Sequence, residues 1–279
     1  MTSKIPTVSI VIPTYNRVAL LKRAVKSVFE QSFSDYELII INDASIDDTR
    51  FFLDELKKKD VRVHPIHHEQ NYYPDISRTL NEGLNTAMGR YIARLDDDDY
   101  WCDSDKLEKQ VTFLDAHHDY VIIGGGTIVI DENNKEKFSY MKIETDAAIR
   151  KRALFANPFT HSTVVFNRGV ALKVGGYGNF KNAEDWDLWL RMGMNGKFYN
   201  FQEYFVRYLM MENSKSFLFK RSQSKEILRI IGTHKKEYPN FYMAYTVNLA
   251  QYCYSFLPFS IRRATHSFFS KMKRGIFSK

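Results

Sequence analysis

The sequence predicts an α/β protein with a mostly parallel central sheet flanked by helices. Two observations in the first hundred residues carry this prediction. Short apolar runs, such as VSIVI at 8–12 and ELIII at 37–41, are typical of strands buried on both faces. Between them lie segments whose apolar residues recur at helical spacing. Repetition of strand and helix indicates parallel strands joined by right-handed crossovers.

The predicted elements follow in order along the chain. Strands are expected at 8–12, 37–41, 61–65 and 90–95, and helices at 20–29, 52–58, 76–88 and 106–117. After Trp101 the pattern is mixed, with strands expected at 120–123 and 127–130, paired around Gly124–Gly126, a helix at 147–155, a strand at 162–167, a Gly175–Gly176 turn, a helix at 185–195 and a strand at 205–208. This second half is expected to extend the same sheet.

The bulk composition is that of an ordinary globular protein, with 279 residues, 44% of them hydrophobic and 26% charged. Cys102 and Cys253 lie far apart, which suits a reducing compartment and indicates neither a disulfide framework nor a zinc site. The short polar start does not resemble a signal peptide, and no apolar stretch approaches the roughly 20 residues that span a bilayer. We therefore expect a cytoplasmic protein.

The net charge of +7 is concentrated at the C-terminus. Residues 238–279 contain no Asp or Glu, six Arg or Lys and eleven aromatic residues. Within 261–276 the apolar residues fall on one face of a predicted helix and the basic residues on the other. Such a helix can lie on an anionic membrane, which would make the protein peripheral on the inner face of the cell membrane, or it can dock on the protein. Both alternatives stay open for residues 259–279.

Polar residues follow three predicted strands, where ligands of parallel α/β sheets bind. They are Pro13–Asn16, Asn42–Ser45 and Asp96–Asp99. These residue types suit a nucleotide diphosphate, since carboxylates accept hydrogen bonds from a base and a ribose. Aspartate oxygens also suit a hard cation, Mg²⁺ or Mn²⁺.

The acidic run Asp96–Asp99 is the sharpest of these features. In an extended segment alternate residues share a side, so we expect Asp96 and Asp98 to point together, opposite Asp97 and Asp99. A solvated acidic turn is the alternative. The position at the end of a buried strand favours a metal site.

A second acidic pair, Glu184 and Asp185, stands at the start of a predicted helix. A sugar hydroxyl is a poor nucleophile, and a carboxylate within hydrogen-bonding reach can remove its proton during attack. The alternative is that these acids complement the helix dipole, with Leu188 and Trp189 as core residues.

Seven segments in one order resemble the family-2 glycosyltransferases, which have the GT-A fold. They are VSIVIPTYNR, ELIIINDASIDDT, TLNEGLNTAMGRYIARLDDDD, KLEKQVTFL, NPFTHSTVVF, GGY and AEDWDLWLRM, and they cover about residues 7–210. The resemblance implies a GT-A catalytic domain over 1–213, with a nucleotide-binding half at 1–99 and an acceptor half at 100–213. A helical, basic and aromatic extension would then occupy 214–279.

The resemblance also implies roles for individual residues. Asp98 falls on the metal-ligand position of the family's Asp-x-Asp motif, Asp96 on the position that holds the ribose or the metal, and Asp185 on that of the catalytic base. Nucleotide contacts are expected from Pro13, Thr14, Tyr15, Asn16, Asp43, Arg94 and Asp97, with Asp43 reading the base, commonly uracil. Glu184 and Trp189 are weaker candidates at the acceptor side.

The implied reaction is the inverting transfer of a hexosyl or N-acetylhexosaminyl group. A nucleotide-diphosphate sugar, with UDP the expected nucleotide, would be the donor, and a glycan or lipid-linked hydroxyl of surface-glycan assembly, such as lipopolysaccharide or capsule, would be the acceptor. Mn²⁺ or Mg²⁺ would stabilise the leaving diphosphate. Many family members carry a His after the strand at 205–208, where this chain has Met211. His161 is a candidate substitute contact to the diphosphate.

Two other classes of function were weighed. A nucleotidyltransferase that makes nucleotide sugars can use a similar sheet, but it needs a Gly-rich basic loop for a triphosphate. Residues 13–17 offer only one positive charge. A nucleic-acid-binding protein is disfavoured because the predicted cleft is acidic and the basic residues lie in the tail.

Overall fold

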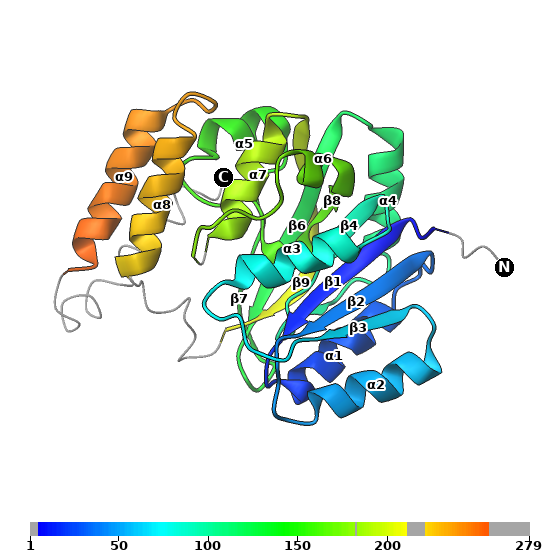
Figure 1. Ribbon diagram of the computed structural model, residues 1–279. Helices are drawn as coiled ribbons and strands as arrows, with labels where there is room; N and C mark the ends of the chain where they lie inside the picture. Colours follow the sequence, from blue (N-terminus) through cyan, green and yellow to red (C-terminus); the bar gives the residue numbers. More distant parts are fainter. Residues whose placement is uncertain (1–4, 182, 211–220, 257–279) are drawn as a thin grey trace.

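The computed structural model describes residues 5–181, 183–210 and 221–256 (Figure 1). The strands are β1 (Val8–Thr14), β2 (Tyr36–Asn42), β3 (Val63–His67), β4 (Tyr91–Arg94), β5 (Tyr100–Trp101), β6 (Tyr120–Ile130), β7 (Glu136–Tyr140), β8 (Val165–Asn167) and β9 (Lys197–Leu209). The helices are α1 (Val18–Phe29), α2 (Thr49–Lys59), α3 (Ile76–Thr86), α4 (Lys106–Ala116), α5 (Asp146–Arg152), the 3₁₀ helix η1 (His161–Thr163), α6 (Arg168–Lys173), α7 (Glu184–Gly193), α8 (Arg221–Thr233) and α9 (Phe241–Tyr254).

Within these residues the strands form one sheet in the order β3-β2-β1-β4-β8-β6-β9-β5, and β7 pairs with β6 outside this path. Strands β1 to β4 are mutually parallel. Strand β8 is antiparallel to both β4 and β6, whereas β6 and β9 are parallel to each other. The predicted α/β architecture with a mostly parallel sheet is confirmed, and the second half does extend the same sheet.

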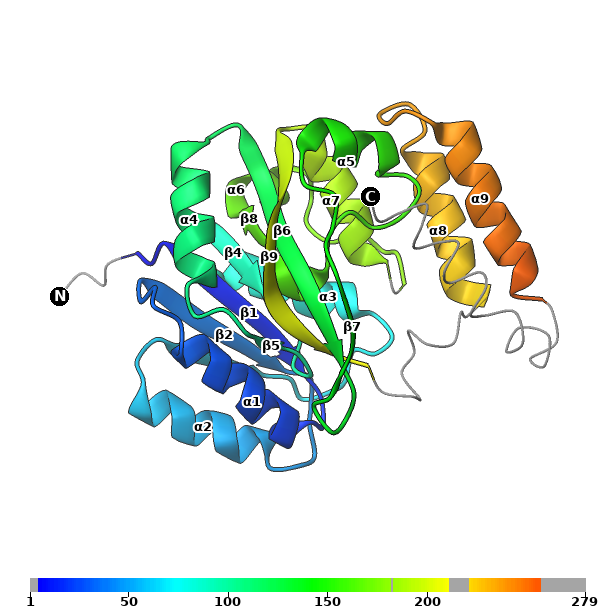
Figure 2. The ribbon, with the colours of Figure 1, turned by 180° about the vertical axis from the view of Figure 1, so that it is seen from behind.

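Helices cover both faces of the sheet (Figures 1 and 2). On one face α1, α2 and α4 pack against alternate residues of β1, including Ile10 and Ile12. On the other face α3, α6 and α7 pack around Val11 and the neighbouring strands. This two-sided burial explains why the sequence of β1 is apolar at nearly every position.

Strand β6 differs from its prediction. We expected two strands paired around Gly124–Gly126, but the chain runs straight through these glycines as one strand of 11 residues. The glycines make room for neighbouring side chains instead of turning the backbone. A Cβ at Gly124 would lie 2.5 Å from the Asn200 Oδ1, and one at Gly125 would overlap the ring of Phe205. The predicted turn at Gly175–Gly176 is confirmed, since both residues have positive φ.

Helices α8 and α9 form a pair that packs beside α5 and α7 (Figure 1). Ile230, Ile231 and Ala244 are fully buried in the same core as α7. The hydroxyl of Tyr238 donates to the carbonyl oxygen of Leu190 at 2.8 Å. The helical character predicted for the extension is therefore observed over 221–256. The proposed domain boundary at 213, and residues 259–279, lie outside the described residues.

No helix in the described part of the chain has both the length and the apolar character needed to cross a membrane.

The burial of α8 predicts that the extension contributes to global stability. Replacing Ile231 by Ala should lower the free energy of unfolding by about 2–5 kcal/mol, because the substitution leaves a cavity in the core. The matched control on the same helix pair is Leu249→Ala, which removes a side chain from a residue that is 39% exposed. The control should cost less than about 0.5 kcal/mol. Equal urea midpoints for the two variants would contradict this packing.

Candidate active site

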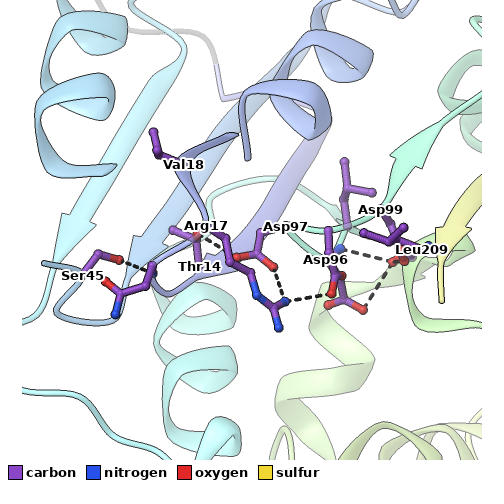
Figure 3. A network of polar contacts seen from close by, with 12 residues as sticks. Thr14, Arg17, Val18, Ser45, Asp96, Asp97, Asp99 and Leu209 are labelled. Atoms are coloured by element: carbon purple, nitrogen blue, oxygen red, sulfur yellow. Dashed lines mark hydrogen bonds and ion pairs between the residues drawn. The ribbon is translucent and has the colours of Figure 1, made fainter. Parts of the chain in front are cut away.

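The three predicted strand ends meet at one edge of the sheet (Figure 3). Thr14, at the end of β1, donates from its hydroxyl to Asp97 Oδ2 at 2.8 Å. The backbone N–H of Asp43 donates to the carbonyl oxygen of Thr14 at 3.0 Å. The loops after β1, β2 and β4 are thus hydrogen-bonded to one another, as the order of parallel strands led us to expect.

The loop after β1 presents one open aromatic ring. Tyr15 is 45% exposed, whereas Thr14 is buried and its hydroxyl is used within the protein. Asn16 has a positive φ of 52° and accepts at Oδ1 from the N–H of Ile46, which joins this loop to the one after β2. Of the residues predicted here, Tyr15 is the one whose side chain is most available to a ligand.

The acidic run forms a turn, closed by a hydrogen bond of 3.1 Å from the N–H of Asp99 to the carbonyl oxygen of Asp96. The hydroxyl of Ser162 lies 2.5 Å from Asp99 Oδ2 and 3.3 Å from Asp96 Oδ2. Asp96 and Asp99 therefore face the same side chain. The expectation that Asp96 and Asp98 point together, opposite Asp97 and Asp99, is wrong because the strand ends before the run.

Arg17 faces the other half of the turn. Its Nη1 lies 3.1 Å from Asp97 Oδ1 and 2.8 Å from Asp98 Oδ2. Burial, followed by the charges of Asp97 and Asp96, raises the pKa of Asp98 to about 7. Sequence reasoning did not assign a role to Arg17. The available signal was that Arg17 is the single positive charge in the segment at 13–17.

The donor set of this turn fits a divalent cation. Asp98 keeps 22% of its side chain exposed, so its oxygens can reach a ligand. The atoms of the acidic side chains that could coordinate a cation are carboxylate oxygens, of the kind that Mg²⁺ and Mn²⁺ prefer. Among the described residues no three His, Cys, Asp or Glu side chains form a ready-made metal cluster. Mg²⁺ at phosphate sites usually takes one or two protein carboxylates and completes its coordination with substrate oxygens and water.

Arg94 lies beneath the turn and is only 1% exposed. Its Nη2 donates to Asp96 Oδ1 at 2.7 Å, its Nη1 to the carbonyl oxygens of Val11 and Leu95, and its Nε to His161 Nε2 at 3.1 Å. The predicted direct contact to a phosphate is not supported, because the guanidinium is enclosed and its donors are used. Against the effect of burial, the charge of Arg94 lowers the pKa of Asp96.

His161 is predicted as a substitute contact to the diphosphate. Burial, followed by the charge of Arg94, lowers its pKa to about 4, so the imidazole is neutral. Its Nε2 already faces Arg94 Nε and the hydroxyl of Tyr177, each at 3.1 Å. Any contact of His161 with a phosphate would therefore lack a positive charge. Met211 lies outside the described residues.

Trp189 belongs to the core. It is fully buried, and its ring packs edge-on against the ring of His161 with centroids 5.7 Å apart. The prediction that Trp189 contacts a ligand is not supported, because no part of the side chain reaches the surface. Trp189 is instead a core residue of its helix, which was the alternative expectation.

Helix α7 begins at Glu184 and carries Asp185 in its first turn. Asp185 Oδ2 accepts from Asn157 Nδ2 at 2.7 Å, and Oδ1 accepts from the N–H of Trp186 at 2.7 Å. Glu184 is buried, and among the described residues its Oε2 has no hydrogen-bond partner. Burial, followed by the charge of Asp185, raises the pKa of Glu184 to about 8. Sequence reasoning missed the role of Asn157 in orienting Asp185.

Asp43 follows β2 and is buried, and it contacts His68 from the loop after β3. Its Oδ1 lies 2.7 Å from His68 Nδ1, and His68 Nε2 lies 2.6 Å from Glu82 Oε2. His68 is only 9% exposed.

Residues 9–175 match the family model for Glycosyl transferase family 2. The match covers more than half of the chain, so the protein belongs to this family and is a glycosyltransferase. The chain is 32% identical over 217 residues to EpsE of Bacillus subtilis, across 76% of this chain and 75% of the relative. It is 31% identical over 220 residues to TuaG of the same organism, across 77% and 84%. EpsE is named as a glycosyltransferase, and TuaG as one of teichuronic acid biosynthesis.

Solved structures confirm the GT-A fold. TarS 1–349 of S. aureus has a TM-score of 0.61 at 17% identity, across 81% of this chain and 64% of that one. The mannosyltransferase PcManGT from Pyrobaculum calidifontis, in complex with GDP-Man and Mn²⁺, has a TM-score of 0.63 at 15% identity, across 90% and 70%. At these identities the likeness concerns the fold alone.

The raised pKa of Glu184 predicts a pH-dependent stability. In the folded protein this carboxyl keeps its proton up to a pH near 8, whereas its ordinary pKa is 4.5. Between these values the folded state binds more protons than the unfolded chain. The free energy of unfolding therefore falls as the pH rises, by at most about 1.4 kcal/mol per pH unit.

We expect Glu184→Gln to flatten this decline between pH 5.5 and 8 in urea titrations. Glu132→Gln, on the exposed turn after β6, is the control and should leave the slope unchanged. A Glu184→Gln slope equal to that of the wild type would contradict the raised pKa.

Proposed function

We propose that this glycosyltransferase moves a hexosyl or N-acetylhexosaminyl group from a nucleotide-diphosphate sugar to an acceptor hydroxyl, with inversion at the anomeric carbon. The observation that carries the proposal is the convergence of two acidic groups from different elements. Asp96, from the turn after β4, accepts from Arg94, and Arg94 also contacts His161 at 3.1 Å. The ring of His161 packs on Trp189 of α7, the helix that carries Asp185 in its first turn. A donor held at the turn would thus lie next to a carboxylate on the acceptor side.

On the acceptor side, Asp185 removes the proton from the attacking hydroxyl. Asn157 fixes the carboxylate by donating to Oδ2, and the N–H of Trp186 fixes the other oxygen. Glu184 is protonated at neutral pH because its pKa is about 8. It therefore adds no second negative charge where the proton is transferred.

On the donor side, Asp43 and Tyr15 line the end of the sheet where the nucleoside would bind. Asp98 and Asp96 would hold Mn²⁺ or Mg²⁺ beside the diphosphate. When bound, such an ion neutralises the charge that develops on the leaving group. PcManGT, a structural neighbour in complex with GDP-Man and Mn²⁺, supports this part of the proposal. TarS in complex with UDP and with UDP-GlcNAc supports a uridine nucleotide.

The acceptor is proposed to be a glycan or a lipid-linked glycan of the cell surface. TuaG is named for teichuronic acid biosynthesis, and WbnJ of Escherichia coli, 30% identical over 190 residues, for O-antigen biosynthesis. A Campylobacter jejuni relative, 34% identical over 158 residues, is named as a glucosyltransferase acting on an undecaprenol-linked glycan. Family membership favours this reaction over nucleotidyl transfer, for which no observation speaks.

A lipid-linked acceptor would place the protein at the inner face of the cell membrane. Helix α9 contains no charged residue and exposes Tyr242, Met243 and Leu249. The sequence that continues from it, through residue 279, adds six Arg or Lys and no acid. An apolar, aromatic face next to a basic segment suits an anionic lipid surface.

The proposed roles predict opposite effects of two substitutions. Asp98→Ala should abolish Mn²⁺-dependent binding of UDP, measured by calorimetry, because the ion loses its main ligand. Asp185→Asn should keep donor affinity within about threefold but lower kcat by at least about 10²-fold, since an amide cannot take the proton. Asp105→Ala, an exposed acid at the start of α4, is the control. Full turnover of UDP-sugars by either site variant would refute the role given to that residue.

Membrane binding is tested by deleting residues 259–279. Each Arg or Lys near an anionic surface contributes about 1 kcal/mol, so the deletion should release most of the protein from anionic liposomes in co-sedimentation. The double substitution Tyr242→Ser and Met243→Ser should weaken binding to the same liposomes. Unchanged sedimentation of both variants would rule out a membrane surface as the partner.

A further inference from the structure

A histidine lies between two carboxylates beside the proposed nucleoside site. His68, in the loop after β3, faces Asp43 with Nδ1 at 2.7 Å and Glu82 of α3 with Nε2 at 2.6 Å. The side chain of His68 is only 4% exposed, whereas that of Glu82 is 38% exposed. The three residues come from three separate segments, so the fold brings them together.

The chemistry of the carboxylate group fixes the direction of the hydrogen bond between His68 and Asp43. An ionised carboxylate accepts hydrogen bonds and donates none. The contact at Nδ1 therefore takes its proton from the ring, with His68 Nδ1 donating to Asp43 Oδ1 at 2.7 Å. Contacts between charged partners are shorter and stronger than neutral ones, in agreement with the distances.

The hydrogen bonds that Asp43 accepts within the protein limit those that it can make to a ligand. Besides the contact from His68, Oδ1 accepts from the N–H of Tyr72 at 3.1 Å, while Oδ2 has only the longer contact of 3.2 Å from the same N–H. Oδ2 thus keeps capacity to accept a further hydrogen bond. As a carboxylate, Asp43 would meet a ligand as a hydrogen-bond acceptor.

We propose that His68, held by Glu82, is the positioning residue that fixes Asp43 as an acceptor, so that the donor site selects a base with a ring N–H. This inference rests on the proposed function. Uracil and guanine present such an N–H beside a carbonyl group, whereas the corresponding ring nitrogens of cytosine and adenine are acceptors. The site should therefore discriminate between bases through the direction of a single hydrogen bond.

Two substitutions of His68 separate positioning from packing. In His68→Asn the amide nitrogen stands near the former Nδ1 and can still donate to Asp43. In His68→Gln the amide reaches toward Glu82 instead. Both variants lose the aromatic ring, which packs against Tyr72 with centroids 4.4 Å apart, so their thermal stabilities should fall alike.

The measurement is calorimetric binding of UDP, GDP, CDP and ADP with Mn²⁺ to the full-length protein. The wild type should bind UDP or GDP at least about tenfold more tightly than CDP and ADP, the value of one well-formed hydrogen bond to a charged group. His68→Asn should keep most of this preference and His68→Gln should lose it. In activity assays with donor sugar, both variants should change KM for the donor more than kcat.

Equal base preference in the Asn and Gln variants would overturn the inference, because a packing role affects both alike. Nitrogen NMR of the wild type should show a proton on Nδ1 of His68, and an unprotonated Nδ1 would also overturn it. If the wild type binds none of the four nucleotides, the proposed function itself fails. If it binds them with Mn²⁺ but without a preference among bases, only the present inference fails.

Discussion

The acidic turn after β4 is the constraint on which the rest of the site depends. Carboxylates this close repel one another, and burial adds a desolvation cost for each charge. The structure lowers these costs by giving the acids different partners. Asp99 is turned inward to Ser162 and to the N–H of Leu209, while Arg94 supports Asp96 from below. The remaining two acids face Arg17. Asp97 is buried and also accepts from Thr14, whereas Asp98 keeps 22% of its side chain exposed.

Arg94 connects the donor side to the acceptor side. One end of its guanidinium holds Asp96, and its Nε donates to His161, whose ring packs on Trp189 of α7. A second set of contacts fixes α7 from outside. Burial disfavours the charge of Asp187. Its pKa is nevertheless lowered by hydrogen bonding from His234, which lies between α8 and α9, and by the charge of Arg191. The helix that carries Asp185 is thus held from two directions, and the C-terminal helices take part in this.

The fold could be predicted from the sequence wherever one face or both faces of an element are buried. β1 and α1 show this, because their apolar residues recur with the period of the element. The glycines of β6 could not be interpreted in this way. The side chains that need their space, Asn200 and Phe205, are some 75 to 80 positions away in the sequence.

Candidate site residues could be named from the sequence where the end or start of an element coincides with a family segment, as at Asp43 after β2 and Asp185 at the start of α7. Their partners were missed because they act across the fold. Arg17 stands about 80 positions before the acids that it faces, and Asn157 lies 28 positions before Asp185. The misassigned direction of Asp98 has a local cause, since periodicity cannot show where a strand gives way to a turn.

The two sides of the site handle charge in opposite ways, and this difference agrees with the proposed chemistry. The donor side gathers carboxylates around one arginine, an arrangement that attracts a cation. On the acceptor side burial keeps Glu184 protonated and His161 neutral near pH 7. A second ionised carboxylate there would compete with Asp185 for the proton of an incoming hydroxyl, whereas a protonated one cannot. The burial of Glu184 therefore leaves Asp185, oriented by Asn157, as the carboxylate of that pair suited to act as the base.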